Sequence, residues 1–112
     1  MRGAYEALIA RTPSLSLCGT AVTAEEALDH LARSACDILV TDVTLPGMDG
    51  VALTSRVAHE RPSLPIVVVS VDEGHRIRAL EAGAATFLSK NGLARTLVPT
   101  LLDLLEPSRS AA

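Results

Sequence analysis

The sequence predicts an α/β domain in which helices cover both faces of a doubly wound parallel sheet. Segments with a period of 3.6 residues alternate with short runs of Val, Ile and Leu, and the connections are short. Hydrophobic residues make up 48% of the 112 residues and aromatic residues only 2%, as suits helices packed on a Val/Ile-rich sheet. This length favours a single domain, which we assign to residues 1–106, with residues 107–112 as a disordered tail.

The first half of the chain contains two clear stop and start signals. Pro13 cannot continue a helix, and Thr23 with Glu26 has the spacing of a capping box. In order, we expect a helix over residues 2–11, a strand over 15–21, a helix over 24–34, a strand over 37–42 and a helix over 51–60.

The second half continues the same alternation. We expect a strand over residues 66–71, a helix over 72–81, a strand over 85–90 and a helix over 93–105. Gly83 follows the second-last helix, where a C-terminal cap favours a left-handed residue. Strands that alternate with helices through short loops form parallel βαβ units with right-handed crossovers.

Charge and hydropathy exclude several classes of function. The formal net charge is −3 and Lys and Arg form no stripe, so we expect no nucleic-acid binding by this chain. The longest nearly apolar stretch, residues 64–71, is too short to span a membrane, and the first ten residues do not resemble a signal peptide. We therefore predict a cytoplasmic protein, in which Cys18 and Cys36 are buried, reduced thiols.

Three polar residues are expected at one edge of the sheet. Asp42, Ser70 and Lys90 each stand at the end of a predicted strand, and the carboxyl ends of parallel strands share an edge where ligands bind. A carboxylate can carry a phosphoryl group as an acyl phosphate, while a hydroxyl and a cation hold its oxygens. A carboxylate that only caps the next loop, and a lysine that only ends a strand, would show the same pattern.

Three blocks in order carry a resemblance to a known family. "DVTLPGMDG", with Pro46, Met48, Asp49 and Gly50, is followed by "IVVVSV" and then by "EAGAATFLSK". Together they resemble the receiver domain of two-component response regulators, which implies a flavodoxin-like fold with strand order 2-1-3-4-5.

The resemblance implies a role for each residue at the sheet edge. Asp42 would accept a phosphoryl group from a histidine kinase or phosphotransfer protein, Ser70 would move to bond the phosphate, and Lys90 would pair with it. Phe87 matches an aromatic residue that switches between exposed and buried rotamers, although a plain core phenylalanine would look the same. Receiver domains are signalling switches, so we expect no enzyme activity beyond this transfer.

The resemblance also implies positions for water access and for a metal. Thr44 and Asp72 match the two positions that tune the access of water to the acyl phosphate, although solvated loop residues would look alike. Mg²⁺ would be held by Asp42, by the backbone of Thr44 and by an acidic pair. That pair is absent here, which puts the metal in doubt; Glu25 and Glu26 are better explained by helix capping.

One departure from the family affects the sheet itself. The strand that carries the acidic pair, and that forms the centre of the family's sheet, is missing from this sequence. Neighbouring strands would keep unpaired backbone groups, so we expect a homodimer or strand exchange.

Two alternatives to a phosphorylated switch follow from the same residues. A degenerate receiver would keep the fold and act as a phosphorylation-independent interaction module. A phosphatase of the haloacid dehalogenase type also uses a strand-end Asp, but it requires a second acid two residues later, where Thr44 stands.

Overall fold

The computed structural model describes residues 7–45 and 47–105. Residues 7–10 are helical, at the end of the first predicted helix. The later elements are α2 (Ala24–Arg33), β1 (Leu39–Asp42), α3 (Gly50–Glu60), β2 (Ile66–Ser70), the 3₁₀ helix η1 (Glu73–His75), α4 (Arg76–Ala82), β3 (Thr86–Ser89) and α5 (Leu93–Leu105). The helix predicted over 72–81 is thus divided into η1 and α4. Pro46 and the predicted tail lie outside the described residues.

The sheet is parallel, with the strand order β1-β2-β3. All five residues of the central strand β2 are buried. Asp42 is in register with Val69, and Ser70 with Ser89, so the three strands end at the same edge. The topology therefore brings the predicted site residues together, because that edge is where a parallel sheet leaves a crevice.

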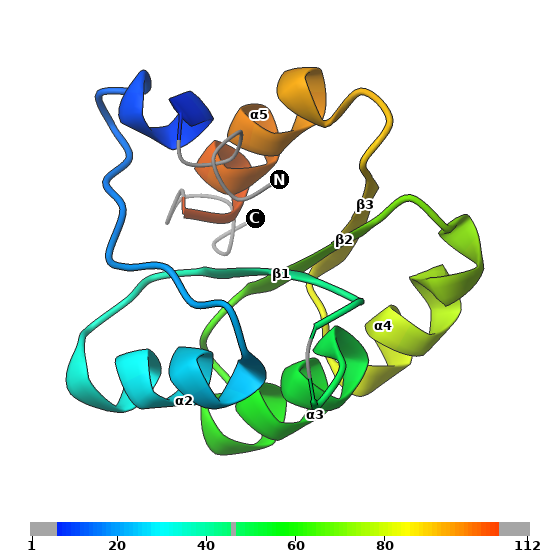
Figure 1. Cartoon of the computed structure of the whole chain (residues 1–112). Helices are drawn as coiled ribbons and strands as arrows, with labels where there is room; N and C mark the ends of the chain where they lie inside the picture. The colour runs from blue at the N-terminus through cyan, green and yellow to red at the C-terminus, as the bar shows by residue number, and fades with distance from the viewer. Residues whose placement is uncertain (1–6, 46, 106–112) are drawn as a thin grey trace.

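Helices cover both faces of this sheet, as Figure 1 shows, with α2, α3 and α4 on one side and α5 with the N-terminal helical segment on the other. Alternate residues of β2 serve different cores. The core under α2, α3 and α4 includes Ile66, Val68 and Phe87, and the core under α5 includes Val67 and Val69. The predicted doubly wound α/β class is confirmed.

The capping signals also act as predicted. Thr23 is the N-cap of α2 and its hydroxyl accepts a hydrogen bond from the Glu26 N–H at 3.1 Å. The Glu26 carboxylate reaches back to the N–H of Val22 at 2.7 Å. Gly83 ends α4 with a φ of 117°, a backbone conformation that residues other than glycine rarely adopt.

The strand predicted over residues 15–21 is wrong. These residues lie in an extended but unpaired segment, and they line a cavity of about 540 Å³ together with residues of β1. A strand requires a neighbour about 4.8 Å away to complete its hydrogen bonds. Local sequence preference alone therefore does not make this segment a strand, since the cavity lies between it and the edge of the sheet.

Exposure corrects one further prediction. Cys18 is exposed and Cys36 is partly buried, so the expectation of two buried thiols is wrong for Cys18; both thiols are free. In the described part of the chain, no helix has the length and apolar character needed to cross a membrane.

Candidate functional site

An ion pair joins the ends of β1 and β3. Lys90 Nζ lies 3.1 Å from Asp42 Oδ1. The side chain of Lys90 is 18% exposed and that of Asp42 is 21% exposed, so solvent reaches both groups. Partial burial strengthens such a pair relative to one on the open surface, while the exposed portion keeps the carboxylate accessible to a reactant.

Backbone hydrogen bonds hold the three strand ends in place. The N–H of Lys90 donates to the carbonyl oxygen of Ser70 at 2.9 Å, and the N–H of Val43 donates to that of Val69 at 3.2 Å. The residues at and just after the ends of β1 and β3 are thus bonded to the end of β2. Side chains fixed in this way by regular secondary structure are positioned more precisely than side chains on a free loop.

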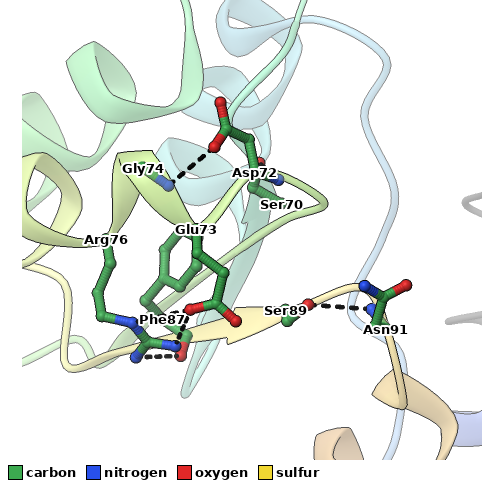
Figure 2. A network of polar contacts seen from close by, with 8 residues as sticks. All are labelled: Ser70, Asp72, Glu73, Gly74, Arg76, Phe87, Ser89 and Asn91. Atoms are coloured by element: carbon green, nitrogen blue, oxygen red, sulfur yellow. Dashed lines mark hydrogen bonds and ion pairs between the residues drawn. The ribbon is translucent and has the colours of Figure 1, made fainter.

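The hydroxyl of Ser70 is oriented by the loop that follows β2. Ser70 is buried, and its Oγ accepts a hydrogen bond from the backbone N–H of Asp72 at 3.1 Å. The Asp72 carboxylate is directed to the other side, where it accepts from the Gly74 N–H at 2.8 Å and starts η1 (Figure 2). Asp72 is exposed and stands just before η1, at the start of the helix predicted over 72–81.

The loop after Asp42 turns back against the strand. Gly50 donates its N–H to the carbonyl oxygen of Val43 at 2.7 Å, and a Cβ at position 50 would lie 1.8 Å from the carbonyl oxygen of Asp42. Only glycine allows this approach. Asp49 caps α3 by accepting from the Ala52 N–H at 2.8 Å. The turn after Asp42 therefore packs against the backbone at the end of β1 and fixes the position of Asp42.

Phe87 is buried in the core and is covered by an arginine. Its ring lies 4.9 Å from the guanidinium carbon of Arg76, which also donates from Nη1 to the Phe87 carbonyl oxygen at 3.3 Å. Glu73 holds the same guanidinium at 2.9 Å, as Figure 2 shows. The sequence analysis singled out neither Arg76 nor Glu73, because a charged pair at the start of a helix reads as an ordinary solvated pair.

Thr44 is exposed and lines the large cavity together with Asp42. The cavity of about 540 Å³ is bounded by β1, by α2 and by residues 14–23. Most of its lining is apolar, and Asp42 is one of the charged residues that line it. Water or a small solute in this cavity would therefore have access to the carboxylate.

The donor atoms of the described residues do not fit a complete Mg²⁺ site. Mg²⁺ requires octahedral oxygen ligands, usually one or two carboxylates with waters and phosphate oxygens. Residues 7–45 and 47–105 contain no group of three or more His, Cys, Asp or Glu side chains that could hold a metal ion. The Asp42 carboxylate is paired with Lys90, and the backbone of Thr44 adds a single carbonyl.

Comparison with known proteins decides the family. The model of the response regulator receiver domain matches residues 1–101. The chain belongs to this family. Solved structures confirm its predicted receiver fold. The three sequence blocks that carried the resemblance therefore belong to a receiver domain.

Two solved structures show the extent of the similarity in three dimensions. The signal receiver domain of an HD domain-containing protein from Pseudomonas fluorescens Pf-5 has a TM-score of 0.86 and 26% identity, with 98% of this chain and 82% of that one covered. A LuxR-family two-component response regulator from Aurantimonas sp. SI85-9A1 has a TM-score of 0.86 and 28% identity, covering 93% of this chain and 76% of that one.

Among curated proteins, a protein-glutamate methylesterase/protein-glutamine glutaminase from Syntrophus aciditrophicus is 40% identical over 86 residues. The match covers 73% of this chain but 25% of that protein. The DNA-binding transcriptional regulator NtrC of Escherichia coli K12 is 33% identical over 75 residues, which is 65% of this chain and 16% of NtrC. This chain thus spans a small part of the curated relatives that it matches.

Proposed function

We propose that this receiver domain is a signalling switch in which Asp42 accepts a phosphoryl group from a histidine kinase or a phosphotransfer protein. The observation that carries the proposal is the 3.1 Å ion pair between Asp42 and Lys90 at the carboxyl edge of the sheet. A carboxylate held beside a fixed cation, and still in part exposed, is suited to receive a dianionic group. We place this switch in the cytoplasm and assign it no activity of its own beyond the transfer.

The transfer is a displacement at phosphorus in which Asp42 is the nucleophile. An oxygen of the Asp42 carboxylate attacks phosphorus, the bond from phosphorus to the donor breaks, and the donor leaves with its electron pair. The product is an acyl phosphate on Asp42. Lys90 then faces a group with more negative charge than the free carboxylate, so its ammonium stabilises the product electrostatically.

Ser70 and Phe87 could change conformation in response to the charge of the phosphoryl group. Ser70 has a hydroxyl that can donate to a phosphoryl oxygen once it turns away from the Asp72 N–H. Phe87 and Ser70 belong to neighbouring strands, and Arg76 contacts the Phe87 ring and its carbonyl. A turn of Ser70 toward Asp42 would loosen the loop that leads to η1 and Arg76. We therefore assign Ser70 and Phe87 to the conformational response, and Thr44 and Asp72 to the access of water.

The test is intact-protein mass after incubation with acetyl phosphate, with and without Mg²⁺. We expect the parent to gain the mass of one phosphoryl group and Asp42→Asn to gain none. Asp29→Asn, an exposed carboxylate in an ion pair on α2, is the matched control and should label like the parent. Labelling of Asp42→Asn to the level of the parent would refute the assignment of Asp42.

A phosphorylation-independent interaction module is the second candidate. It is favoured by the absence of a three-ligand acidic cluster from the described residues, since the metal normally offsets charge in phosphoryl transfer. This candidate predicts no labelling of the parent in either condition and binding to a partner that Asp42→Asn does not change.

The open edge of the sheet bears on the partner in both cases. β1 pairs with β2 on one side, and the described sheet ends at β1 on the other. An edge strand can take up a strand from a second chain. We therefore propose homodimer formation or strand exchange at β1, to be measured as the oligomeric state by light scattering; a monomer at all concentrations would refute it.

A further inference from the structure

The two cysteines of the chain meet at one side of the large cavity. Cys18 lies in the extended segment before α2, and Cys36 lies just before β1. Cys18 Sγ is 3.7 Å from the carbonyl oxygen of Ala35, to which it donates. Because a carbonyl oxygen lies only about 2.8 Å from the next Cα, the Cys18 sulfur is close to Cys36. Both residues line the same cavity, and both are free thiols.

The two thiols differ in their environment. Burial raises the pKa of Cys36 to about 11, with a hydrogen bond between the two thiols and the charges of Cys18 and Asp37 as further causes, while Arg61 acts in the opposite direction. The Cys36 thiol is therefore protonated and protected near neutral pH. Cys18 is exposed, so it is the thiol that an external reagent reaches first.

We propose that Cys18 and Cys36 form a reversible disulfide that joins the segment before α2 to the start of β1. The phosphoacceptor chemistry does not use either cysteine, so this proposal stands independently of the one for Asp42. It rests on the approach of the Cys18 sulfur to the residue before Cys36 and on the cavity wall that the two cysteines share.

A low-molecular-weight disulfide, such as oxidised glutathione, serves as the oxidant. The Cys18 thiolate attacks one of its sulfurs, which forms a mixed disulfide and releases one thiolate. The Cys36 thiol then gives up its proton and attacks Cys18 Sγ, which forms the internal disulfide and releases the second thiolate. Two electrons pass from the cysteines to the oxidant, and the two cysteine protons end on the released thiols.

The bond would restrain one wall of the cavity that reaches Asp42. It closes a loop that contains α2, because Cys18 precedes this helix and Cys36 follows it. In the reduced protein, residues 15–21 form no ladder of backbone hydrogen bonds with the other described residues. Oxidation would therefore limit their motion and fix the opening of the cavity beside Thr44 and Asp42.

The test follows the intact mass of the reduced, full chain during incubation with oxidised glutathione at neutral pH, without a reductant at analysis. We expect the parent to lose the mass of two hydrogen atoms and to stay monomeric on a non-reducing gel. Cys36→Ser should keep one glutathione on Cys18, because no second thiol can displace it. A parent that keeps glutathione, or that forms disulfide-linked dimers instead, would overturn the proposal.

A second measurement separates a specific bond from a chance oxidation. Hydrogen exchange at the amides of residues 15–21 should slow at least several-fold in the oxidised parent relative to the reduced parent. The double variant Cys18→Ser, Cys36→Ser treated with the same oxidant is the control and should show no change. Equal exchange in oxidised and reduced parent would show that the bond does not restrain this segment.

Discussion

Lys90 Nζ lies 3.1 Å from Asp42 Oδ1, and the two residues come from strands that do not pair with each other. β2 lies between them, and the carbonyl oxygen of its last residue, Ser70, accepts a hydrogen bond from the backbone N–H of Lys90. The ion pair therefore spans the end of the central strand. Because the Lys90 ammonium lies beside the Asp42 carboxylate, we expect the lysine to affect the transfer more than the folding.

Replacement of Lys90 tests this expectation. Lys90→Ala should slow phosphoryl uptake from acetyl phosphate by about 10–100-fold, the equivalent of one charge-assisted hydrogen bond. The free energy of unfolding should change by no more than about 1 kcal/mol, because the pair is partly solvated. Arg95→Ala, which removes an exposed cation from α5, is the control and should label at the parent's rate. Equal rates for Lys90→Ala and the parent would exclude this role.

Gly50 offers a test of the support behind Asp42. Gly50→Ala places a Cβ 1.8 Å from the Asp42 carbonyl oxygen, a contact that requires the backbone to shift. We expect the free energy of unfolding to fall by about 3 kcal/mol in urea denaturation. A Cβ at Gly19→Ala meets only the mobile His30 ring, at 3.3 Å from Nδ1, and should change stability by less than about 0.5 kcal/mol. Similar stability of the two variants would contradict this explanation of Gly50.

The sequence predicted where Asp42, Ser70 and Lys90 lie, but it did not predict where the sheet ends. Asp42, Ser70 and Lys90 could be placed together because parallel strands end on one side, which is a property of topology rather than of detailed packing. The strand over residues 15–21 could not be judged in this way. Whether an extended segment becomes a strand depends on a partner, and the cavity beside β1 leaves it without one.

The contact between Arg76 and Phe87 is a second feature that could not be predicted from the sequence. Arg76 reaches the carbonyl of a residue eleven positions later, and no periodicity in the sequence joins the two. The cap at Thr23, in contrast, could be predicted because both of its partners lie within one helical turn. Local contacts of this kind can be predicted from the sequence, whereas contacts between distant residues depend on how the chain folds in three dimensions.

The cap itself can be measured. Thr23→Ala removes the acceptor for the Glu26 N–H and should lower the free energy of unfolding by about 1 kcal/mol. Thr20→Ala makes the same chemical change at an exposed position in the preceding segment and should leave stability within about 0.5 kcal/mol of the parent. If both variants were equally stable, the hydroxyl of Thr23 would not contribute to α2.

The raised pKa of Cys36 predicts how stability changes in alkaline solution. Its pKa is about 11 in the folded chain against 9.0 for the ordinary thiol, raised first by burial and then by Cys18 and Asp37, and lowered by Arg61. Below pH 9 both folded and unfolded chains keep the proton, so this stabilising contribution is fully present. Between pH 9 and about 11 the unfolded chain releases the proton more readily, so the contribution is lost as pH rises.

Urea denaturation of the reduced protein at several pH values measures this loss. The free energy of unfolding of the parent should fall more steeply between pH 9 and 11 than that of Cys36→Ser, which has no thiol at this position. Cys18→Ser should show an intermediate slope, because burial still raises the Cys36 pKa while the thiol contact and the charge of Cys18 are gone. Parallel curves for the parent and Cys36→Ser would mean that the folded chain does not hold this proton more tightly than the unfolded chain does.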